Sequence, residues 1–476
     1  MQRILTASAY CSGRQVRKPG RRAPKTEQNT PMLFPIQGWQ ILTGTLMLGL
    51  TLSIGYTVQQ SEFTLLYPQY LVWFGLYWGV FLRVSARREV VFFLALAVLL
   101  RLALVFAMPQ LSDDVYRFIW DGRLWTQGIS PFAQLPAYYL QAGQEVPGLR
   151  RELYDQLNSP AYYTVYPPIA QAIFGLGVWL FPDSPYGSAI AMKSALFLFE
   201  LGTLWILPKL LKQLKLPARN VLIYALNPLI ILELVGNLHL EGVMFFFLLA
   251  ALWLLLKKRW WLSALLFGLS GAAKLLSLLF LPLFLHTLGW KRLIGYGALA
   301  LGLLALLFWP FLSGPGLDHF AQSLDLYFRK FEFNASMYYL LRTLGEWQVG
   351  YNPIAVLGPA LAVAVVLIVM SLLIWGGRYS DRALLQNMLF AITAYLLLAT
   401  TVHPWYLTLP LGLCLFTRYR FPVLWSALIM LTYINYSYVP YRENLWMVAV
   451  EYALVLGFLA WELHAFGALS KEPRNA

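Results

Sequence analysis

The chain has 476 residues, of which 59% are hydrophobic and only 12% are charged. Soluble globular proteins carry about 25% charged residues, so this composition, with a mean hydropathy of +0.60, excludes a soluble or intrinsically disordered chain. The two cysteines, Cys11 and Cys414, exclude a disulfide framework and a cysteine-ligated metal cluster.

Residues 1–37 are strongly basic. Seven Lys and Arg side chains stand there against a single acid, Glu27, so this region supplies a large part of the formal net charge of +14. Residues 1–31 contain no apolar core, which argues against a signal peptide. We expect residues 1–37 to form a disordered cytoplasmic tail, or in part an upstream extension if translation begins at Met32.

Apolar blocks of bilayer-spanning length follow from Trp39 to the C-terminus. They predict an all-α polytopic membrane protein with a bundle of about 12–13 transmembrane helices. Two further stretches are less regular: 165–181 is bounded by prolines, and 262–285 carries Lys274 in its middle, where a straight span is disfavoured. The predicted spans are 39–58, 63–82, 89–108, 187–207, 221–237, 240–256, 293–312, 352–376, 384–401, 406–417, 421–439 and 445–465.

Basic residues in short loops mark the cytoplasmic side of a membrane protein. All basic clusters and the tail face the cytoplasm if 165–181 dips or lies at the outer surface and 262–285 enters and returns. If both segments cross fully, two basic clusters lie outside. The clusters are Arg83/Arg87/Arg88, Lys209/Lys212/Lys215/Arg219, Lys257/Lys258/Arg259, Lys291/Arg292, Arg378/Arg382, Arg418/Arg420 and Lys471/Arg474.

The first arrangement places both termini in the cytoplasm and brings the polar segments together on the opposite face. We therefore expect one acidic, aromatic, extracytoplasmic site, and no nucleic-acid partner, because the positive charge is largely accounted for by topology. We place the protein in a bacterial inner membrane. The converging segments are Leu111–Tyr166, Asn237–Glu241, Ser313–Tyr351, His403–Tyr406 and Tyr438–Asn444.

This organisation divides the chain into five predicted regions. They are the tail 1–37, two additional N-terminal transmembrane helices in 38–88, a catalytic membrane core in 89–312 that includes the large first external loop 109–186, a second external loop 313–351, and C-terminal transmembrane helices in 352–476.

The strongest local signal lies directly after the third predicted span, in the segment Leu111–Arg123. Its adjacent carboxylates, Asp113 and Asp114, repel each other, which raises the pKa of one and suits it to proton transfer; alternatively they share a cation. The structural interpretation is a helix N-terminus, with Ser112 or Asp113 as the cap and acids in the first turn. Both interpretations can hold together.

With its continuation Gly128–Phe132 and Tyr163–Pro168, this segment resembles the GT-C superfamily of membrane glycosyltransferases, which take sugars from polyprenyl-phosphate donors. The likeness is to GPI mannosyltransferase I and to bacterial mannosyltransferase relatives. Asp113 falls on the first acid of the family's Asp-x-Asp motif, whereas Val115 occupies the second. A divalent cation, Mg²⁺ or Mn²⁺, held by Asp113 and Asp114 therefore stays an open alternative, and no other cofactor is implied.

The resemblance continues along residues 89–450 at a series of shorter matches. They are Lys193 with Glu200, Asn227-Pro228 followed by Glu241, Lys274 with Pro282 beyond it, Asn334 within 331–336, and His403 with Tyr406. Ionisable groups inside spans are costly and so are functional candidates by themselves. The structural alternative is that Lys193 pairs with Glu200 on one helix face. The candidate cations for a lipid phosphate are Arg117, Arg123, Lys193, Lys274 and Arg329.

The resemblance implies an inverting hexosyltransferase, with mannose favoured, that uses a polyprenyl-phosphate sugar donor and a lipid or glycan acceptor among membrane lipids. Asp113 is the expected general base, and Asp114 or Asp121 orients the site. The predicted substrate-binding residues are Arg117, Arg123, Tyr166, Lys193, Glu241, Lys274, Asn334, His403 and Tyr406. The alternatives are a lipid-linked glycan polymerase or ligase, and a transporter or flippase, for which the sequence lacks the expected internal repeat.

Overall fold

The computed structural model describes residues 37–312, 314–375 and 380–469. The chain divides into two compact units, Met1–Ile41 and Leu42–Ala476, and the packing and the site discussed below belong to the second. Residues 1–36 of the predicted tail, together with Arg378, Lys471 and Arg474, lie outside the described residues. The described ranges are helical and contain no β-strand; a single parallel bridge pairs Phe333 with Thr401.

The helices follow one another along the chain with short connections. The first are α1 (Gly38–Thr57), α2 (Phe63–Arg83), α3 (Arg87–Val105), α4 (Asp114–Thr126), η1 (Pro136–Leu140), α5 (Arg151–Tyr154), α6 (Pro168–Leu180) and α7 (Pro185–Gln213). The central ones are η2 (Ala218–Asn220), α8 (Val221–Ala225), α9 (Pro228–Ile230), the π-helical turn η3 (Ile231–Gly236), α10 (Glu241–Leu256), α11 (Trp260–Ala273), η4 (Leu275–Phe284), α12 (Leu285–Leu288) and α13 (Trp290–Phe308). The last are η5 (Trp309–Phe311), α14 (Gly316–Arg329), α15 (Met337–Val349), α16 (Ile354–Trp375), α17 (Asp381–Leu398), η6 (Pro404–Leu407), α18 (Thr408–Cys414), α19 (Phe421–Leu428), η7 (Ile429–Ser437) and α20 (Leu445–Leu469).

Four of the described helical segments are long and apolar enough to cross a membrane: Pro185–Gln213, Trp290–Phe311, Ile354–Trp375 and Leu445–Phe466. A fifth span results if the pair α8 and α9–η3, which bends by 52°, is counted as one. These helices confirm an all-α polytopic membrane protein. The other members of the bundle of about 12–13 spans, α1 to α3 included, stay predictions from the sequence.

The two irregular apolar segments do not form straight spans. α6 has 13 residues and so extends roughly 20 Å, less than the ~30 Å hydrocarbon core of a bilayer. α11 ends at Ala273, and the extended backbone of Lys274 separates it from η4. Lys258, before α11, and His286, after η4, line the same cavity. The segment between them therefore enters and returns, as its charge pattern predicts.

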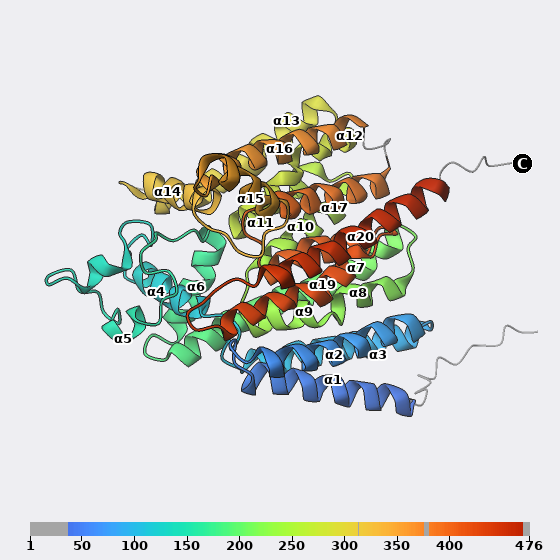
Figure 1. The fold of residues 1–476 in the computed structure, drawn as a ribbon, viewed down its shortest axis with the longest axis horizontal. Helices are drawn as coiled ribbons and strands as arrows, with labels where there is room; N and C mark the ends of the chain where they lie inside the picture. The colour runs from blue at the N-terminus through green and yellow to red at the C-terminus, as the bar shows by residue number, and fades with distance from the viewer. Residues whose placement is uncertain (1–36, 313, 376–379, 470–476) are drawn as a thin grey trace, which may run out of the picture. The chain divides into compact units, whose positions relative to one another are not determined.

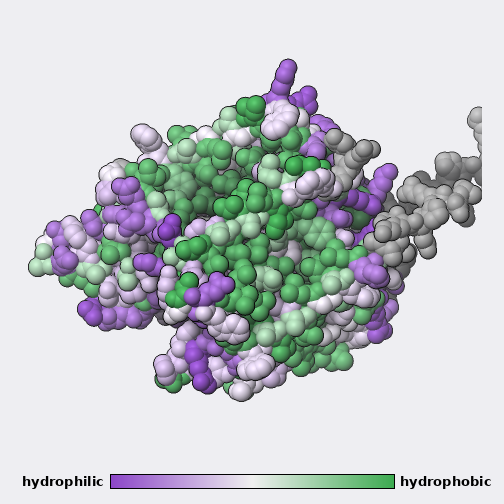
Figure 2. Space-filling view, turned by 45° about the horizontal axis from the view of Figure 1, so that its top comes forward, coloured by the Kyte–Doolittle hydropathy of each residue, from purple (hydrophilic) through white to green (hydrophobic). Residues whose placement is uncertain are grey.

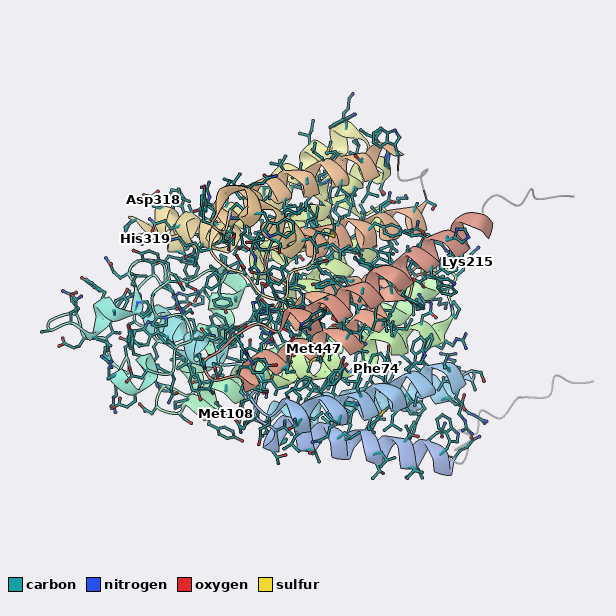
Figure 3. The ribbon with its side chains drawn as sticks, viewed as in Figure 1. Phe74, Met108, Lys215, Asp318, His319 and Met447 are labelled. Carbon is teal, nitrogen blue, oxygen red and sulfur yellow. The ribbon has the colours of Figure 1, made fainter. Side chains whose placement is uncertain are left out.

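The helical unit has two chemically different ends. Figure 1 shows α4, α5, α6 and α14 gathered at one end of the long helices. Met108, Asp318 and His319 lie toward that end, whereas Lys215 lies at the opposite one (Figure 3). In Figure 2 hydrophobic residues cover the middle of the visible face, and hydrophilic residues gather toward both sides. The acidic motif and the basic Lys215 cluster are thus separated by the length of the apolar helices.

Helix α4, which carries the acidic motif, is fixed against α6 by close packing. The Phe118 ring stacks on Phe174, with centroids 4.3 Å apart and planes 7° apart. A Cβ added to Gly122 would lie 2.6 Å from the carbonyl oxygen of Phe174, so the helices can approach this closely only because residue 122 is glycine. This contact sets the direction in which the N-terminus of α4 points.

Candidate active site

Asp113 and Asp114 stand at the N-terminus of α4 in different environments. Asp113 occupies the N-cap position, but its carboxylate makes no capping hydrogen bond, and the residue is exposed. The Ser112 hydroxyl accepts a long hydrogen bond, 3.4 Å, from the Asp114 backbone N–H. Asp114 in turn accepts a 2.7 Å bond from the Asn158 amide. Of the two proposed caps, only Ser112 contacts the helix backbone, and the Asp113 carboxylate is left available.

Partial desolvation, together with the neighbouring Asp114 carboxylate, raises the pKa of Asp113. A carboxylate with a raised pKa is a stronger proton acceptor than an ordinary aspartate. Asp113 therefore combines the exposure and the basicity that a general base requires.

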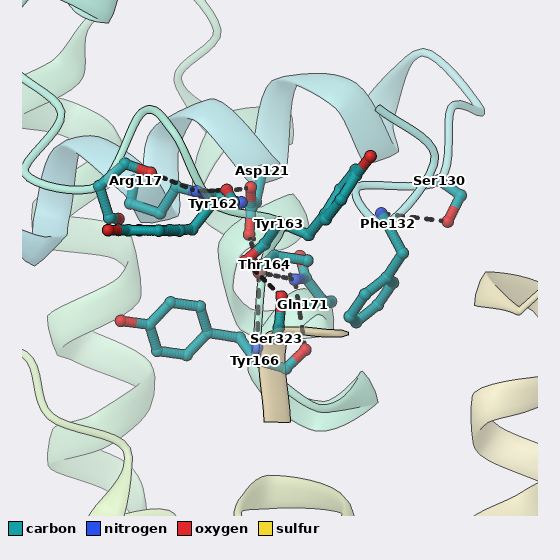
Figure 4. A network of polar contacts seen from close by, with 11 residues as sticks. Arg117, Asp121, Ser130, Phe132, Tyr162, Tyr163, Thr164, Tyr166, Gln171 and Ser323 are labelled. Carbon is teal, nitrogen blue, oxygen red and sulfur yellow. Dashed lines mark hydrogen bonds and ion pairs between the residues drawn. The ribbon is translucent and has the colours of Figure 1, made fainter. Parts of the chain in front are cut away.

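Arg117 and Asp121 form a buried ion pair one helical turn further along α4, with Nε and Oδ1 2.8 Å apart. The second Asp121 oxygen accepts hydrogen bonds from Thr164 (2.5 Å) and Gln171 (3.1 Å). The Arg117 guanidinium also donates to the carbonyl oxygen of Tyr162, at 3.0 Å (Figure 4). These contacts bind the loop before α6 to α4, and they engage both charged groups with the protein itself.

Two further predicted residues of the first loop also make contacts within the protein. Tyr166 packs edge-on against Phe118, with ring centroids 4.9 Å apart. Arg123 donates to the carbonyl oxygens of Gly148 and, at 3.4 Å, Pro182. Both residues shape the loop around α4, so neither lies free beside the Asp113 carboxylate.

Lys274 and Glu241 meet at two breaks in the helices. Glu241 begins α10, Lys274 separates α11 from η4, and their side chains form an ion pair. The Glu241 side chain is buried, whereas that of Lys274 is 27% exposed. The Lys274 ammonium also lies 5.3 Å from the centre of the Tyr406 ring. Lys274 is thus a partly exposed cation with an aromatic neighbour.

A stack of aromatic rings lies beside this ion pair. His403 stacks on Phe333 (centroids 4.6 Å apart) and on Trp405 (4.5 Å), and Trp405 stacks on His239 (3.6 Å). The edge of His403 also faces Tyr406, at 5.4 Å. Burial, with Lys274 and His239 nearby, lowers the pKa of His403 to about 3, so its ring is neutral at physiological pH. The structure brings together four predicted residues here: Glu241, Lys274, His403 and Tyr406.

Glu233, in the π-helical turn η3, connects this ring stack to the acidic motif. Its Oε1 accepts a 2.8 Å hydrogen bond from Tyr433, and its Oε2 accepts one of 3.1 Å from Asn237. Nε2 of His239 lies 3.2 Å from Oε2. The Asn237 side-chain oxygen accepts a 3.4 Å bond from the backbone N–H of Leu111, two residues before Asp113. The Tyr433 oxygen lies 3.4 Å from the Leu111 carbonyl oxygen.

Glu233 was a candidate from sequence only as an ionisable group inside a span, and its partners were not predicted. Tyr433 is 200 positions away, so no local pattern could pair the two residues. Asn237 belongs to a polar segment expected at the outer face, but its contact with Leu111 depends on the π-helical turn. The one usable signal was the presence of a buried acid in an apolar segment.

The remaining predicted residues lie elsewhere in the core. Lys193 is buried and donates to the Ala107 carbonyl oxygen at 2.5 Å. The alternative that Lys193 pairs with Glu200 is wrong, because Arg101 of α3 forms the ion pair with Glu200, at 2.9 Å. Seven residues along a helix rise about 10 Å, which favours a partner from the neighbouring helix. Arg329 pairs with Asp325 on exposed α14.

Asn334 is buried at a turn with φ of +47°. Its side-chain amide donates to Glu451 at 3.3 Å, its backbone N–H donates to Glu443, and its carbonyl oxygen accepts a 2.7 Å bond from Tyr452. These bonds hold the adjacent Phe333 in its bridge to Thr401 and so under the His403 ring.

No group of three or more His, Cys, Asp or Glu side chains within the described ranges is arranged to hold a metal ion. Asp113 and Asp114 stay the predicted pair for a divalent cation, and no chemical step below passes through a metal.

A polytopic membrane protein with an available carboxylate and a partly exposed lysine at one end of its helices fits the class of membrane-bound transferases. Comparison with protein families identifies it further. Residues 34–289 match the family described as alpha-(1->6)-mannopyranosyltransferase, N-terminal domain. Because this match covers more than half of the sequence, the chain belongs to that mannosyltransferase family and is a glycosyltransferase. A search of curated proteins found no match. The family match confirms the resemblance to mannosyltransferases and includes the Asp113 motif, Glu233, Glu241 and Lys274.

Proposed function

We propose that the protein is a GT-C-type mannosyltransferase that moves a mannose residue from a polyprenyl-phosphate donor to a hydroxyl group of a lipid or glycan acceptor, with inversion at the anomeric carbon. The observation that carries this proposal is the network of Glu233, which connects the loop before Asp113 to the ring stack beside Lys274. A base for the acceptor and a cation for the leaving phosphate thus belong to one connected cluster.

Asp113 is proposed as the general base, because it is exposed, makes no capping bond and has a raised pKa. The acceptor hydroxyl transfers its proton to Asp113 while its oxygen forms a bond to the anomeric carbon. The bond between that carbon and the phosphate oxygen breaks, and polyprenyl phosphate leaves with the electron pair. Asp114, fixed by Asn158, orients this end of α4.

Arg117 and Asp121 are proposed as positioning residues, since their buried pair joins α4 to the loop at Tyr162. This role replaces the direct catalytic role considered for Asp121 and the phosphate contact considered for Arg117. Tyr166 supports the same packing from the other side of Phe118.

Lys274 is proposed as the cation that neutralises the growing charge on the leaving phosphate. Such stabilisation is often the largest single contribution to catalysis in a site of low dielectric constant. Lys274 suits this role better than Lys193 or Arg123, because it is partly exposed, whereas those two donate to backbone carbonyl oxygens. His403 and Tyr406 complete the wall beside it, and the neutral His403 ring leaves the positive charge on Lys274.

The proposed site faces away from the cytoplasm in a bacterial inner membrane, with both chain termini inside. The support is the separation of charge: the Lys215 cluster lies at the end of the helices opposite Met108, which leads into the acidic motif (Figure 3). Basic loops mark the cytoplasmic side.

The test uses membranes that contain the full-length protein and synthetic polyprenyl-phosphate sugars. Release of polyprenyl phosphate is measured with mannose, glucose or galactose as the sugar, with and without a chelator. We expect release from the mannose donor that is abolished by Asp113→Asn. Release only from donors with long glycan chains would indicate a polymerase or ligase, and sugar-lipid translocation without release would indicate a flippase.

A further inference from the structure

A second polar cluster lies at the cytoplasmic end of the bundle as proposed above, far from the Asp113 site. It is built on α7 and α10, which pack against each other. Trp205 of α7 and Trp253 of α10 meet edge to face, with ring centroids 5.8 Å apart and planes at 73°. Trp205 is 58% exposed on the outside of the bundle. The two indoles thus form an aromatic surface that faces the surroundings of the helices.

Two lysines converge on this surface from the ends of the same helices. The Lys257 ammonium lies 3.7 Å from the centre of the Trp253 ring, and the Lys209 ammonium lies 5.3 Å from the same centre and also over Trp205. Contact with indole faces stabilises each cation, but it cannot cancel the repulsion between two ammonium groups that share one ring. An anion between them would.

The protein itself supplies no such anion among its described residues. Neither Lys209 nor Lys257 forms an ion pair within that part of the chain. The sequence contains no Asp or Glu in 201–232 or in 242–290. Asp381, from another helix, lines a cavity with the next residue, Lys258. The excess positive charge at the two indoles is therefore not compensated internally.

We propose that Lys209, Lys257, Trp205 and Trp253 form a binding site for the phosphate of an anionic phospholipid. Indole rings favour the level of lipid headgroups, and basic pockets between transmembrane helices bind anionic headgroups. The acyl chains would lie along the outer face of α7, where Leu198, seven residues before Trp205, is 67% exposed. A soluble phosphate would gain nothing from that apolar face, which is why the site selects a lipid. This inference does not depend on the transferase mechanism.

The experiment measures lipid retained by purified full-length protein, by native mass spectrometry after equilibration with mixed micelles of phosphatidylglycerol and phosphatidylcholine. The wild type is expected to retain phosphatidylglycerol preferentially, and excess glycerol phosphate is expected not to displace it. The variant K209Q/K257Q should lose this preference by about 10-fold or more. The variant K209R/K257R, which keeps both charges, should retain it.

The matched control is K291Q/R292Q, which removes two positive charges from a basic pair beside the exposed Trp290. This control should bind phosphatidylglycerol as the wild type does. Thermal unfolding in a neutral detergent establishes that each variant is folded, and the single variants K209Q and K257Q are used if the double variant is not. Equal loss in both double variants, equal retention of the two lipids by the wild type, or an unchanged preference in K209Q/K257Q would overturn the proposal.

Discussion

Replacing Glu233 with glutamine is expected to slow sugar transfer while leaving donor binding largely unchanged. Glutamine offers one acceptor oxygen where glutamate offers two, so the bond from Tyr433 or the bond from Asn237 is lost. A hydrogen bond to a charged group contributes about 1.5–3 kcal/mol, and a buried donor left without an acceptor costs about 1–3 kcal/mol. The loss falls on the network that contacts the Leu111 backbone, two residues before Asp113.

Only part of that energy is expressed as movement of Asp113, but small movements matter in catalysis. A displacement of about 1 Å can reduce a rate by about 100-fold. We therefore expect kcat of Glu233→Gln to fall by about 10- to 100-fold, with the KM for the donor little changed because Lys274 and its neighbours are intact. Glu233→Asp, which keeps both acceptor oxygens on a shorter side chain, should be less affected.

The assay is steady-state release of polyprenyl phosphate by full-length protein in proteoliposomes, with donor varied at saturating acceptor. The matched control is Glu462→Gln, since Glu462 is also buried and accepts the backbone N–H groups of Arg420 (2.7 Å) and Phe421 (3.0 Å). Glu462 lies far along α20 and touches no residue of the site. Wild-type kcat in Glu233→Gln, or an equal loss in both variants, would refute a positioning role for Glu233.

Two further predictions concern the charges of the site. Lys274→Gln should raise the donor KM and lower kcat, with a smaller effect in Lys274→Arg; recovery of activity in E241Q/K274Q would mean that Lys274 serves only to neutralise Glu241. The pH profile of kcat/KM should have an acidic limb above the range of an ordinary aspartate, because Asp113 must be ionised and its pKa is raised. Activity is then lost as the pH falls through that raised value. In Asp114→Asn this limb should move to lower pH, since the neighbouring charge is gone; an unmoved limb would show that Asp113 does not set it.

The sequence predicted those features that depend on local chemistry. A lysine in the middle of an apolar stretch predicted the interruption at Lys274, because a charge disfavours a straight span, and the chain does break there. His239 and Glu241, two residues apart, required an irregular backbone to act together. That irregularity is present as the π-helical turn η3 and the positive φ of Leu238, +66°.

Features that depend on tertiary contacts could not be predicted in this way. The partner of Glu200 is Arg101, which lies 99 positions away on another helix, so the spacing of Lys193 and Glu200 was misleading. The Glu233–Tyr433 bond joins distant segments. The roles of Arg117 and Asp121 were also hidden, since their burial depends on Thr164 and Gln171 folding back over α4. A single sequence shows which groups are unusual, but not which of them meet.

The most direct test of the central proposal is the effect of Asp113→Asn on release of polyprenyl phosphate from polyprenyl-phosphate mannose. Asparagine preserves the size of the side chain and cannot accept the acceptor proton; the α4 N-terminus should be unaffected, because the Asp113 side chain does not cap it. The loss of a general base lowers rates by about 100- to 10,000-fold. We expect a loss of that size with unchanged expression, membrane insertion and thermal unfolding. Wild-type release by Asp113→Asn would contradict the assignment of Asp113 as the base.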